Sequence, residues 1–160
     1  MTRHRFIQFV TVAALGLVLA IGQAGAMGNN GQPEAKVDTD YTKAVALIKA
    51  KQYAQALPLL EKAAGRDARN ADIQNHLGYA NRKLKNMDAA LKYYLAALEI
   101  DPKHRGANEY LGELYLETNQ LAKAEERLEV LNDACFFGCE EYTELKEKIA
   151  AYKAGRTKGS

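Results

Sequence analysis

The sequence predicts an all-α protein, a solenoid of about three helix–turn–helix repeats followed by a C-terminal capping helix. Between residues 38 and 154 the apolar side chains recur at helical spacing, and no stretch shows the alternation of a half-buried strand. A set of small and aromatic residues recurs with a period of about 34 residues, which indicates stacked copies of one structural unit. The stretch after the last copy has one apolar stripe, as expected of a helix that covers an open end.

The first 26 residues are predicted to be a signal peptide. Arg3 and Arg5 make the start basic, and the run from Phe6 to Ile21 is almost without charge. Ala24-Gly25-Ala26 supplies the small residues that a signal peptidase requires. The alternative is a membrane anchor, but the apolar run has 16 residues where a spanning helix needs roughly 20. We expect cleavage after Ala26 and export, to the periplasm of a bacterium.

Removal of this segment changes the charge balance. The whole chain has 22 basic and 20 acidic residues, for a formal net charge of +2. Arg3 and Arg5 lie in residues 1–26 and no acidic residue does, so residues 27–160 carry 20 of each sign. We therefore expect no nucleic-acid partner, because an excess of basic residues is the electrostatic signature of such proteins. After cleavage we expect no membrane attachment.

The internal repeat is clearest in its middle copy, which contains Leu77-Gly78, Ala90, Tyr94, Ala97 and Pro102. The corresponding positions of the following copy hold Leu111-Gly112, Ala124, Leu128 and Leu131. The corresponding positions of the preceding copy hold Ala44, Ala56, Leu60 and Ala63. The copies therefore cover about residues 37–70, 71–104 and 105–138.

This pattern resembles the tetratricopeptide repeat, a helix–turn–helix unit of about 34 residues with Leu-Gly, Tyr, Ala, an aromatic residue, Ala and Pro at fixed offsets. The resemblance implies a right-handed solenoid. The first and third copies depart from the pattern: Lys43-Ala44 replaces Leu-Gly, Pro58 falls within a predicted helix, and Phe136 replaces the proline. Two repeats with flanking helices are the alternative.

Turn and capping residues fit the same register. Asn86 and Asn119 lie at the turns inside the second and third repeats, where Asn tolerates left-handed backbone. Asn70 is expected to cap the helix that begins at Ala71. A capping helix is predicted over about 139–153. Residues 27–37 are predicted to be a flexible linker before a folded domain at 38–154, and 155–160 a disordered tail.

By resemblance to the family, the first helix of each repeat lines a concave groove that binds a protein segment. The predicted partner-binding residues are Tyr41, Val45, Ile48, Asn75, His76, Tyr79, Arg82, Lys83, Glu109, Tyr110, Glu113, Leu116 and Glu117. Tyrosine suits such a groove because it offers apolar area and a hydroxyl at low entropic cost. The alternative is that each tyrosine only fills a helix-packing position.

Two other functions find no support in the sequence. Family members that clamp a peptide's terminal carboxylate use Lys, Asn and Arg where this chain has Tyr41, Val45, His76, Gly106 and Tyr110. Sequence patterns of nucleophilic, phosphate-binding or paired-histidine sites are absent from the chain. We therefore expect a binding protein without enzymatic activity, cofactor or bound metal.

Cys135 and Cys139 are the two cysteines of the chain. Their four-residue spacing does not match the CxxC of redox or haem motifs. A disulfide across the corner between the third repeat and the capping helix is predicted, because exported cysteine pairs generally oxidise. Phe136 and Phe137 would then lie near the open end of the repeat, where at least one can be buried. A copper site and two free thiols are the alternatives.

The segment CFFGCEEYxxL also resembles small exported bacterial tetratricopeptide proteins of unassigned function. The sequence is thus interpreted as a periplasmic scaffold or adaptor that binds another protein. An exported copper carrier or thiol-redox protein that uses Cys135 and Cys139 is the alternative. The partner, the binding of a peptide or a folded surface, and the oligomeric state are left open.

Overall fold

The computed structural model describes residues 38–157, and within this range it contains seven α-helices and no strand. The predicted signal peptide (1–26), the predicted linker (27–37) and residues 158–160 of the predicted tail lie outside the described residues. None of the described helices has the length and apolar character needed to cross a membrane. The helices are α1 (Thr39–Lys49), α2 (Tyr53–Arg66), α3 (Ala71–Lys83), α4 (Met87–Ile100), α5 (Arg105–Glu117), α6 (Leu121–Ala134) and α7 (Glu140–Thr157).

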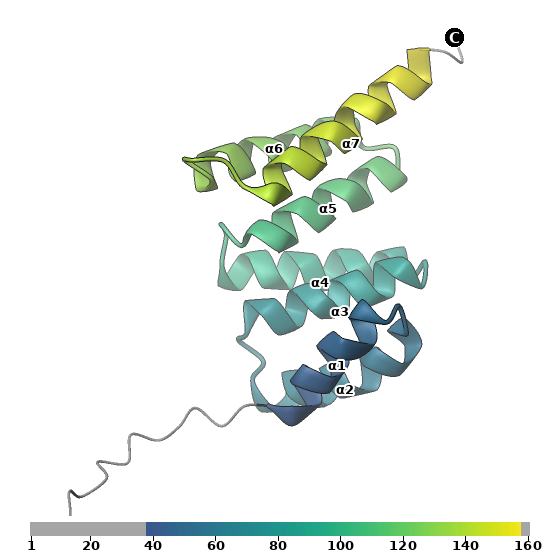
Figure 1. Ribbon diagram of the computed structural model, residues 1–160, viewed down its shortest axis with the longest axis vertical. Helices are drawn as coiled ribbons and strands as arrows, with labels where there is room; N and C mark the ends of the chain where they lie inside the picture. Colours follow the sequence, from purple (N-terminus) through teal and green to yellow (C-terminus); the bar gives the residue numbers. More distant parts are fainter. Residues whose placement is uncertain (1–37, 158–160) are drawn as a thin grey trace, which may run out of the picture. The chain divides into compact units, whose positions relative to one another are not determined.

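The helices stack in chain order as two layers. α1, α3, α5 and α7 form one layer, and α2, α4 and α6 form the other (Figure 1). Each predicted repeat holds one helical hairpin, and α7 packs on both helices of the last hairpin. This arrangement confirms the prediction of an all-α helical repeat solenoid.

Repeated small residues allow this close stacking. The repeated positions Ala44, Ala56, Ala90 and Ala124 are fully buried, as are the larger Leu60, Tyr94 and Leu131. These residues belong to three successive apolar clusters rather than one central core. Each hairpin therefore buries its apolar face only by contact with its neighbours, as expected of a repeat protein.

The turns inside the hairpins follow the same repeat. Lys51, Lys85 and Asn119 occupy equivalent positions of the three copies and have φ angles of 59°, 66° and 61°. The prediction for Asn119 is confirmed, but the one for Asn86 is wrong, because the left-handed residue is its neighbour Lys85. Asn86 instead precedes α4 with φ of −83°. The backbone amide of Lys85 donates a hydrogen bond to the Arg82 carbonyl, and the amide of Asn86 donates one to the Asn81 carbonyl. These two bonds hold the turn, so the left-handed conformation is possible for a lysine.

The predicted cap of the second repeat is confirmed. Asn70 precedes α3, and its Oδ1 accepts a hydrogen bond from the Ile73 amide. This bond satisfies one of the amides that have no partner within the first turn of a helix. The start of α3, which carries groove residues, is thereby fixed by the residue before it.

The capping helix is longer than predicted. It continues through Gly155 to Thr157, so the prediction that the tail begins at residue 155 is wrong. Contacts late in the helix explain the difference: Tyr152 donates a hydrogen bond to Asn119 Oδ1, and Lys153 pairs with Glu125. Leu145 and Ile149 are buried against the last hairpin.

Both phenylalanines of the α6–α7 connection are exposed, so the prediction that at least one is buried is wrong. Phe136 is 88% exposed and Phe137 is 96% exposed. The open end of the last hairpin is already covered by apolar residues of α7, including Leu145. No apolar space is therefore left for the connection to fill.

Candidate functional site

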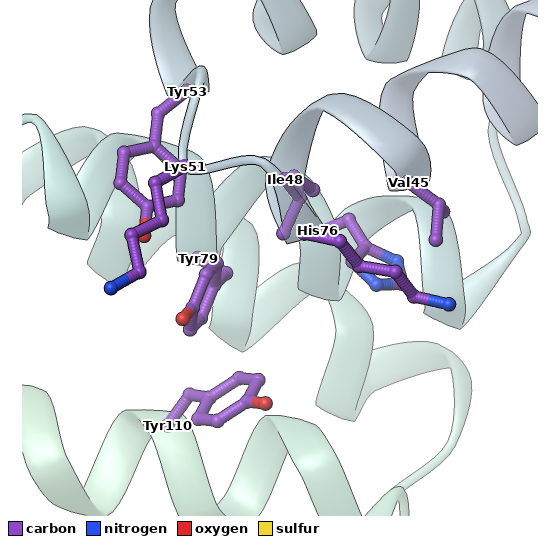
Figure 2. A pocket seen from close by; sticks show the side chains of 8 residues that line it. Val45, Ile48, Lys51, Tyr53, His76, Tyr79 and Tyr110 are labelled. Carbon is purple, nitrogen blue, oxygen red and sulfur yellow. The ribbon is translucent and has the colours of Figure 1, made fainter.

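The helix layer of α1, α3 and α5 contains a cavity of about 320 Å³. We call this cavity the tyrosine groove, and its lining residues are Val45, Ile48, Lys49, Lys51, Tyr53, His76, Tyr79 and Tyr110 (Figure 2). All three hairpins contribute to it. The groove exists because the stacked hairpins place one face of each first helix on the same side of the molecule.

Three tyrosines, one from each hairpin, form a row across the groove (Figure 2). The ring centroids of Tyr53 and Tyr79 are 5.9 Å apart, and those of Tyr79 and Tyr110 are 4.7 Å apart. Partial burial raises the pKa of Tyr79 and raises that of Tyr110 to about 12. Both hydroxyls therefore keep their protons at neutral pH and can donate or accept hydrogen bonds at the groove surface.

Lysines provide the charge at this surface. Lys49 and Lys51 line the groove, and Lys83 Nζ lies 5.0 Å from the ring centroid of Tyr79, at cation–π distance. None of the three forms an ion pair with another described residue. The segment 41–60 also contains Lys43 and no acidic residue. The groove therefore combines an aromatic floor with a cationic rim.

His76 forms a fixed wall of the groove. Its Nδ1 lies 3.0 Å from the Tyr41 hydroxyl and 2.9 Å from the Asp72 carbonyl oxygen. A carbonyl oxygen can only accept, so Nδ1 carries the proton in this contact. Burial lowers the pKa of His76, which favours the neutral imidazole. His76 is thus a neutral, oriented residue of the wall.

Arg82 does not line the groove as predicted, because it is only 2% exposed. Its guanidinium lies 2.6 Å from both Glu113 Oε2 and Glu117 Oε1, and its Nε donates to the Tyr94 hydroxyl at 3.4 Å. These contacts join α3 to α4 and α5. Arg82 therefore fixes the relative position of two neighbouring hairpins beneath the tyrosine row.

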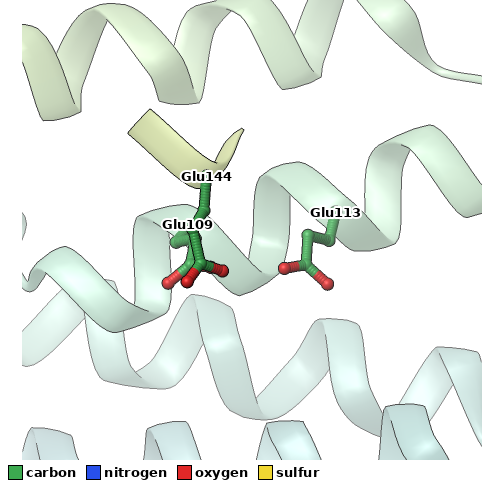
Figure 3. A group of neighbouring side chains, drawn as sticks. All are labelled: Glu109, Glu113 and Glu144. Atoms are coloured by element: carbon green, nitrogen blue, oxygen red, sulfur yellow. The ribbon is translucent and has the colours of Figure 1, made fainter. Parts of the chain in front are cut away.

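A second ionic cluster joins α5 to α7. Lys148 Nζ lies 3.0 Å from Glu144 Oε2 and 3.4 Å from Glu109 Oε1, and it also contacts Glu113 Oε1. Oxygens of the three carboxylates lie within 4.8 Å of one another (Figure 3). Burial raises the pKa of Glu109 to about 8. The ammonium of Lys148 supplies the positive charge of this cluster. The cluster links α7 to α5 at the C-terminal end of the solenoid.

The predicted site residues thus divide by position. Val45, Ile48, His76, Tyr79 and Tyr110 line the groove. Tyr41 and Lys83 contact those lining residues. Glu113 and Glu117 belong to the ionic clusters. The expectation that all members line the surface is wrong for Asn75, Arg82, Glu109 and Leu116, which are buried. They are buried because the next hairpin or α7 covers them.

Sequence reasoning missed three lining residues, Lys49, Lys51 and Tyr53. Lys49 occupies the position in the first repeat that Lys83 occupies in the second, so the repeat itself carried that signal. Lys51 lies in the turn and Tyr53 begins α2. Both were missed because only the first helix of each repeat was considered.

The cysteines lie at the corner between α6 and α7. The Cα atoms of Cys135 and Cys139 are 5.6 Å apart, and their sulfur atoms are at bonding distance. This Cα separation is usual for a disulfide. Cys135 follows the last residue of α6, Cys139 precedes α7, and Gly138 between them has a φ of 84°.

Comparison with known families now identifies the fold. Two models described as tetratricopeptide repeat match residues 41–105 and 82–149. The chain belongs to the tetratricopeptide-repeat family.

One human protein contains a short stretch that is similar in sequence to part of this chain, and two solved structures have a similar fold. The human protein O-mannosyl-transferase TMTC3 is 39% identical over 57 residues, which cover 36% of this chain and 6% of that protein. The chain thus spans only a small part of the curated relatives it matches. The secretion chaperone SycD of Yersinia enterocolitica, in complex with a YopD peptide, has a TM-score of 0.62 at 20% identity, covering 76% of this chain and 92% of that chain. The Sgt2 repeat domain of Aspergillus fumigatus has a TM-score of 0.67 at 19% identity. The similarity covers 76% of this chain and 81% of that chain.

Proposed function

We propose that this protein is a scaffold or adaptor that binds a segment of a partner protein in its tyrosine groove. The observation that carries the proposal is the row of Tyr53, Tyr79 and Tyr110 along an open cavity of about 320 Å³. Half-buried tyrosines on a rigid helical frame lose little entropy on binding, and they are typical anchors of protein interfaces. The SycD complex, in which a similar fold binds a peptide, supports this proposal.

The groove favours a partner segment with apolar or aromatic side chains and nearby carboxylates. Val45, Ile48 and the tyrosine rings offer apolar contact, and Lys49 and Lys51 offer two positive charges. Arg82 and Lys148 are already paired with glutamates and cannot supply further charge. The carboxylate-clamp residues are absent from the matching positions, so an internal segment is the proposed ligand.

We also propose that the protein acts after export, in the periplasm, with Cys135 and Cys139 oxidised. The signal-peptide pattern of residues 1–26 and the 5.6 Å Cα separation of the cysteines support this part of the proposal. A copper carrier would need further soft ligands near the cysteines. Among residues 38–157 the cluster of three metal-ligating side chains is Glu109, Glu113 and Glu144, which includes neither cysteine.

Peptide selection from a random displayed library tests the proposed function. The exported protein should enrich sequences that combine apolar or aromatic residues with Asp or Glu, and a fluorescent copy of an enriched peptide should bind it. Tyr79→Ala with Tyr110→Ala should weaken this binding more than about tenfold, as expected for central aromatic anchors.

Tyr93→Ala is the matched control, because Tyr93 is a half-buried tyrosine of α4 outside the groove. It should leave the binding of the fluorescent peptide unchanged. Loss of binding in Tyr93→Ala but not in the double variant, or failure to enrich any sequence, would contradict the proposal. Circular dichroism of each variant separates loss of binding from loss of fold.

A further inference from the structure

The α6–α7 connection presents two adjacent phenylalanines to solvent. Phe136 and Phe137 are 88% and 96% exposed, whereas Leu95, the next most exposed large apolar residue described, is 48% exposed. Their rings meet edge to face with centroids 5.0 Å apart. Exposed apolar area of this kind is unfavourable in water, and a contiguous exposed patch commonly marks an interaction site.

The local structure holds this pair in place. Cys135 and Cys139 lie at either side of it, and the Gly138 amide donates a hydrogen bond to the Cys135 carbonyl at 2.8 Å. A helix leads into the connection and another leads out of it (Figure 1). A connection ordered in this way loses little freedom on binding, which favours its use as an anchor.

Acidic residues flank the phenylalanines in the sequence, and one of them, Glu141, lies 3.9 Å from Arg105 of α5. The segment 128–144 contains several acidic residues and no Lys or Arg, and Asp133 and Glu140 are exposed. We call Asp133–Glu141 the acidic phenylalanine tip. An anionic membrane surface would repel such a tip. An apolar site with a cationic rim would attract it, because opposite charges at an interface steer and orient the partners.

The tyrosine groove has this complementary character. Its floor is aliphatic and aromatic, and Lys49 and Lys51 are part of its lining. The groove begins on α1 and α2, whereas the tip joins α6 to α7 at the other end of the helix stack (Figure 1). A single stack of rigid hairpins does not bring its own tip into its own groove.

We propose that the acidic phenylalanine tip of one copy binds in the tyrosine groove of a second copy. This inference rests on the proposed function, because it names a second copy of this chain as an occupant of the groove. The two surfaces of such a contact differ, so each added copy leaves one tip and one groove open. A contact of this kind produces linear head-to-tail chains rather than a closed dimer, unless the rotation between copies closes a ring.

Sedimentation velocity of the exported protein over a range of concentrations tests the inference. The mass of the wild type should rise with concentration beyond that of a dimer. Phe136→Ser with Phe137→Ser should remain monomeric, and so should Lys49→Glu with Lys51→Glu. All four residues are exposed, so both variants should fold, and Lys49→Glu alone provides a milder second groove variant.

Mixing the two double variants gives the sharpest result. One retains only a working tip and the other only a working groove, so the mixture should form a two-chain complex and stop there. The matched controls are Leu95→Ser, another exposed apolar residue, and Lys62→Glu with Lys92→Glu, two exposed lysines outside the groove. Both controls should assemble like the wild type.

A monomeric wild type at every concentration overturns the inference, and so does an assembly that the tip and groove variants do not change. Phenylalanine-dependent sedimentation with phosphatidylglycerol vesicles, without self-association, also overturns it in favour of a membrane contact. If the protein is monomeric but still binds a library peptide through Tyr79, only the self-association is wrong. If no peptide binds either, the proposed function fails as well.

Discussion

The ring of Tyr94 fills the space that a Cβ atom on Gly78 would occupy. Such a Cβ would lie 2.6 Å from both Cδ1 and Cε1 of Tyr94, which is far inside van der Waals contact. Tyr94 is fully buried and its hydroxyl accepts a hydrogen bond from Arg82, so the ring has no room to move away. The repeat pattern of Gly in one helix and an aromatic residue in the next is therefore a direct packing contact.

Gly78→Ala should consequently destabilise the protein by about 1–3 kcal/mol through overpacking. Chemical denaturation measures the change in the free energy of unfolding. The control is Gly65→Ala on α2, where an added Cβ meets no atom within 4 Å. That substitution should stabilise the helix by up to about 1 kcal/mol, the propensity difference between Ala and Gly. Equal effects at both positions would contradict the packing argument.

Arg82→Met should destabilise the protein by about 3 kcal/mol, because it leaves Glu113 and the Tyr94 hydroxyl without their buried partner. Methionine retains an unbranched side chain in the same space. Lys85→Met tests the exposed member of the same cluster, since Lys85 pairs with Glu117 from a side chain that is largely in solvent. Its effect on the free energy of unfolding should be less than about 1 kcal/mol. If the two substitutions cost the same, burial does not govern this cluster.

The buried carboxyl of Glu109 should make stability depend on pH. Burial raises its pKa from 4.5 to about 8, so between these values the folded state binds more protons than the unfolded state. Its contribution to stability is complete below about pH 4.5 and is lost as the pH rises through 8.

Glu109→Gln isolates this contribution. The stability of the wild type relative to Glu109→Gln should fall between pH 5 and pH 8, as measured by thermal unfolding in a buffer series. Burial lowers the pKa of His76, so this residue makes stability rise with pH below its usual pKa. Because His76 is present in both proteins, its effect cancels in the difference between them. Glu61→Gln, at an exposed position of α2, should show no such difference. A flat difference for Glu109→Gln would show that its carboxyl is ionised in the folded protein.

Reduction of the oxidised protein should lower its thermal midpoint while leaving helix content nearly unchanged at room temperature. A disulfide that closes the short loop from Cys135 to Cys139 should contribute about 2 kcal/mol by the chain-entropy estimate. Thiol counting by alkylation under denaturing conditions should find no free cysteine before reduction. Two free thiols, or copper released in equal amount to the protein, would favour the alternative of a thiol or metal protein.

The local residue pattern predicted most of the fold. The recurrence of Leu-Gly, Ala and Tyr identified the hairpins, because each of these residues meets a constraint of its own helix pair. The sequence predicted a left-handed backbone at Asn86 in the second turn, but the left-handed residue is Lys85, one position earlier. Side-chain preference at Asn86 suggested it, but backbone hydrogen bonds of the turn select Lys85.

The site was predictable only in part, since exposure depends on neighbours that are distant in the sequence. Tyr79 and Tyr110 were found from their positions in the repeat, and in the structure both line the groove with their ring centroids 4.7 Å apart. Arg82 and Glu109 lie on the groove-side helices but are buried, because the next hairpin supplies carboxylates to Arg82 and α7 supplies the ammonium of Lys148 as a hydrogen-bond donor to Glu109.

The sequence by itself determined the helical repeat, its small-residue contacts and the family of the protein, because these follow from the spacing of residues within one repeat. The tertiary structure alone decided which polar residues of the groove helices face solvent and which are paired beneath the surface. It also decided that α7 covers the last apolar face and leaves Phe136 and Phe137 exposed. Burial is a property of packing between hairpins, and the pattern within one hairpin does not specify what its neighbour covers.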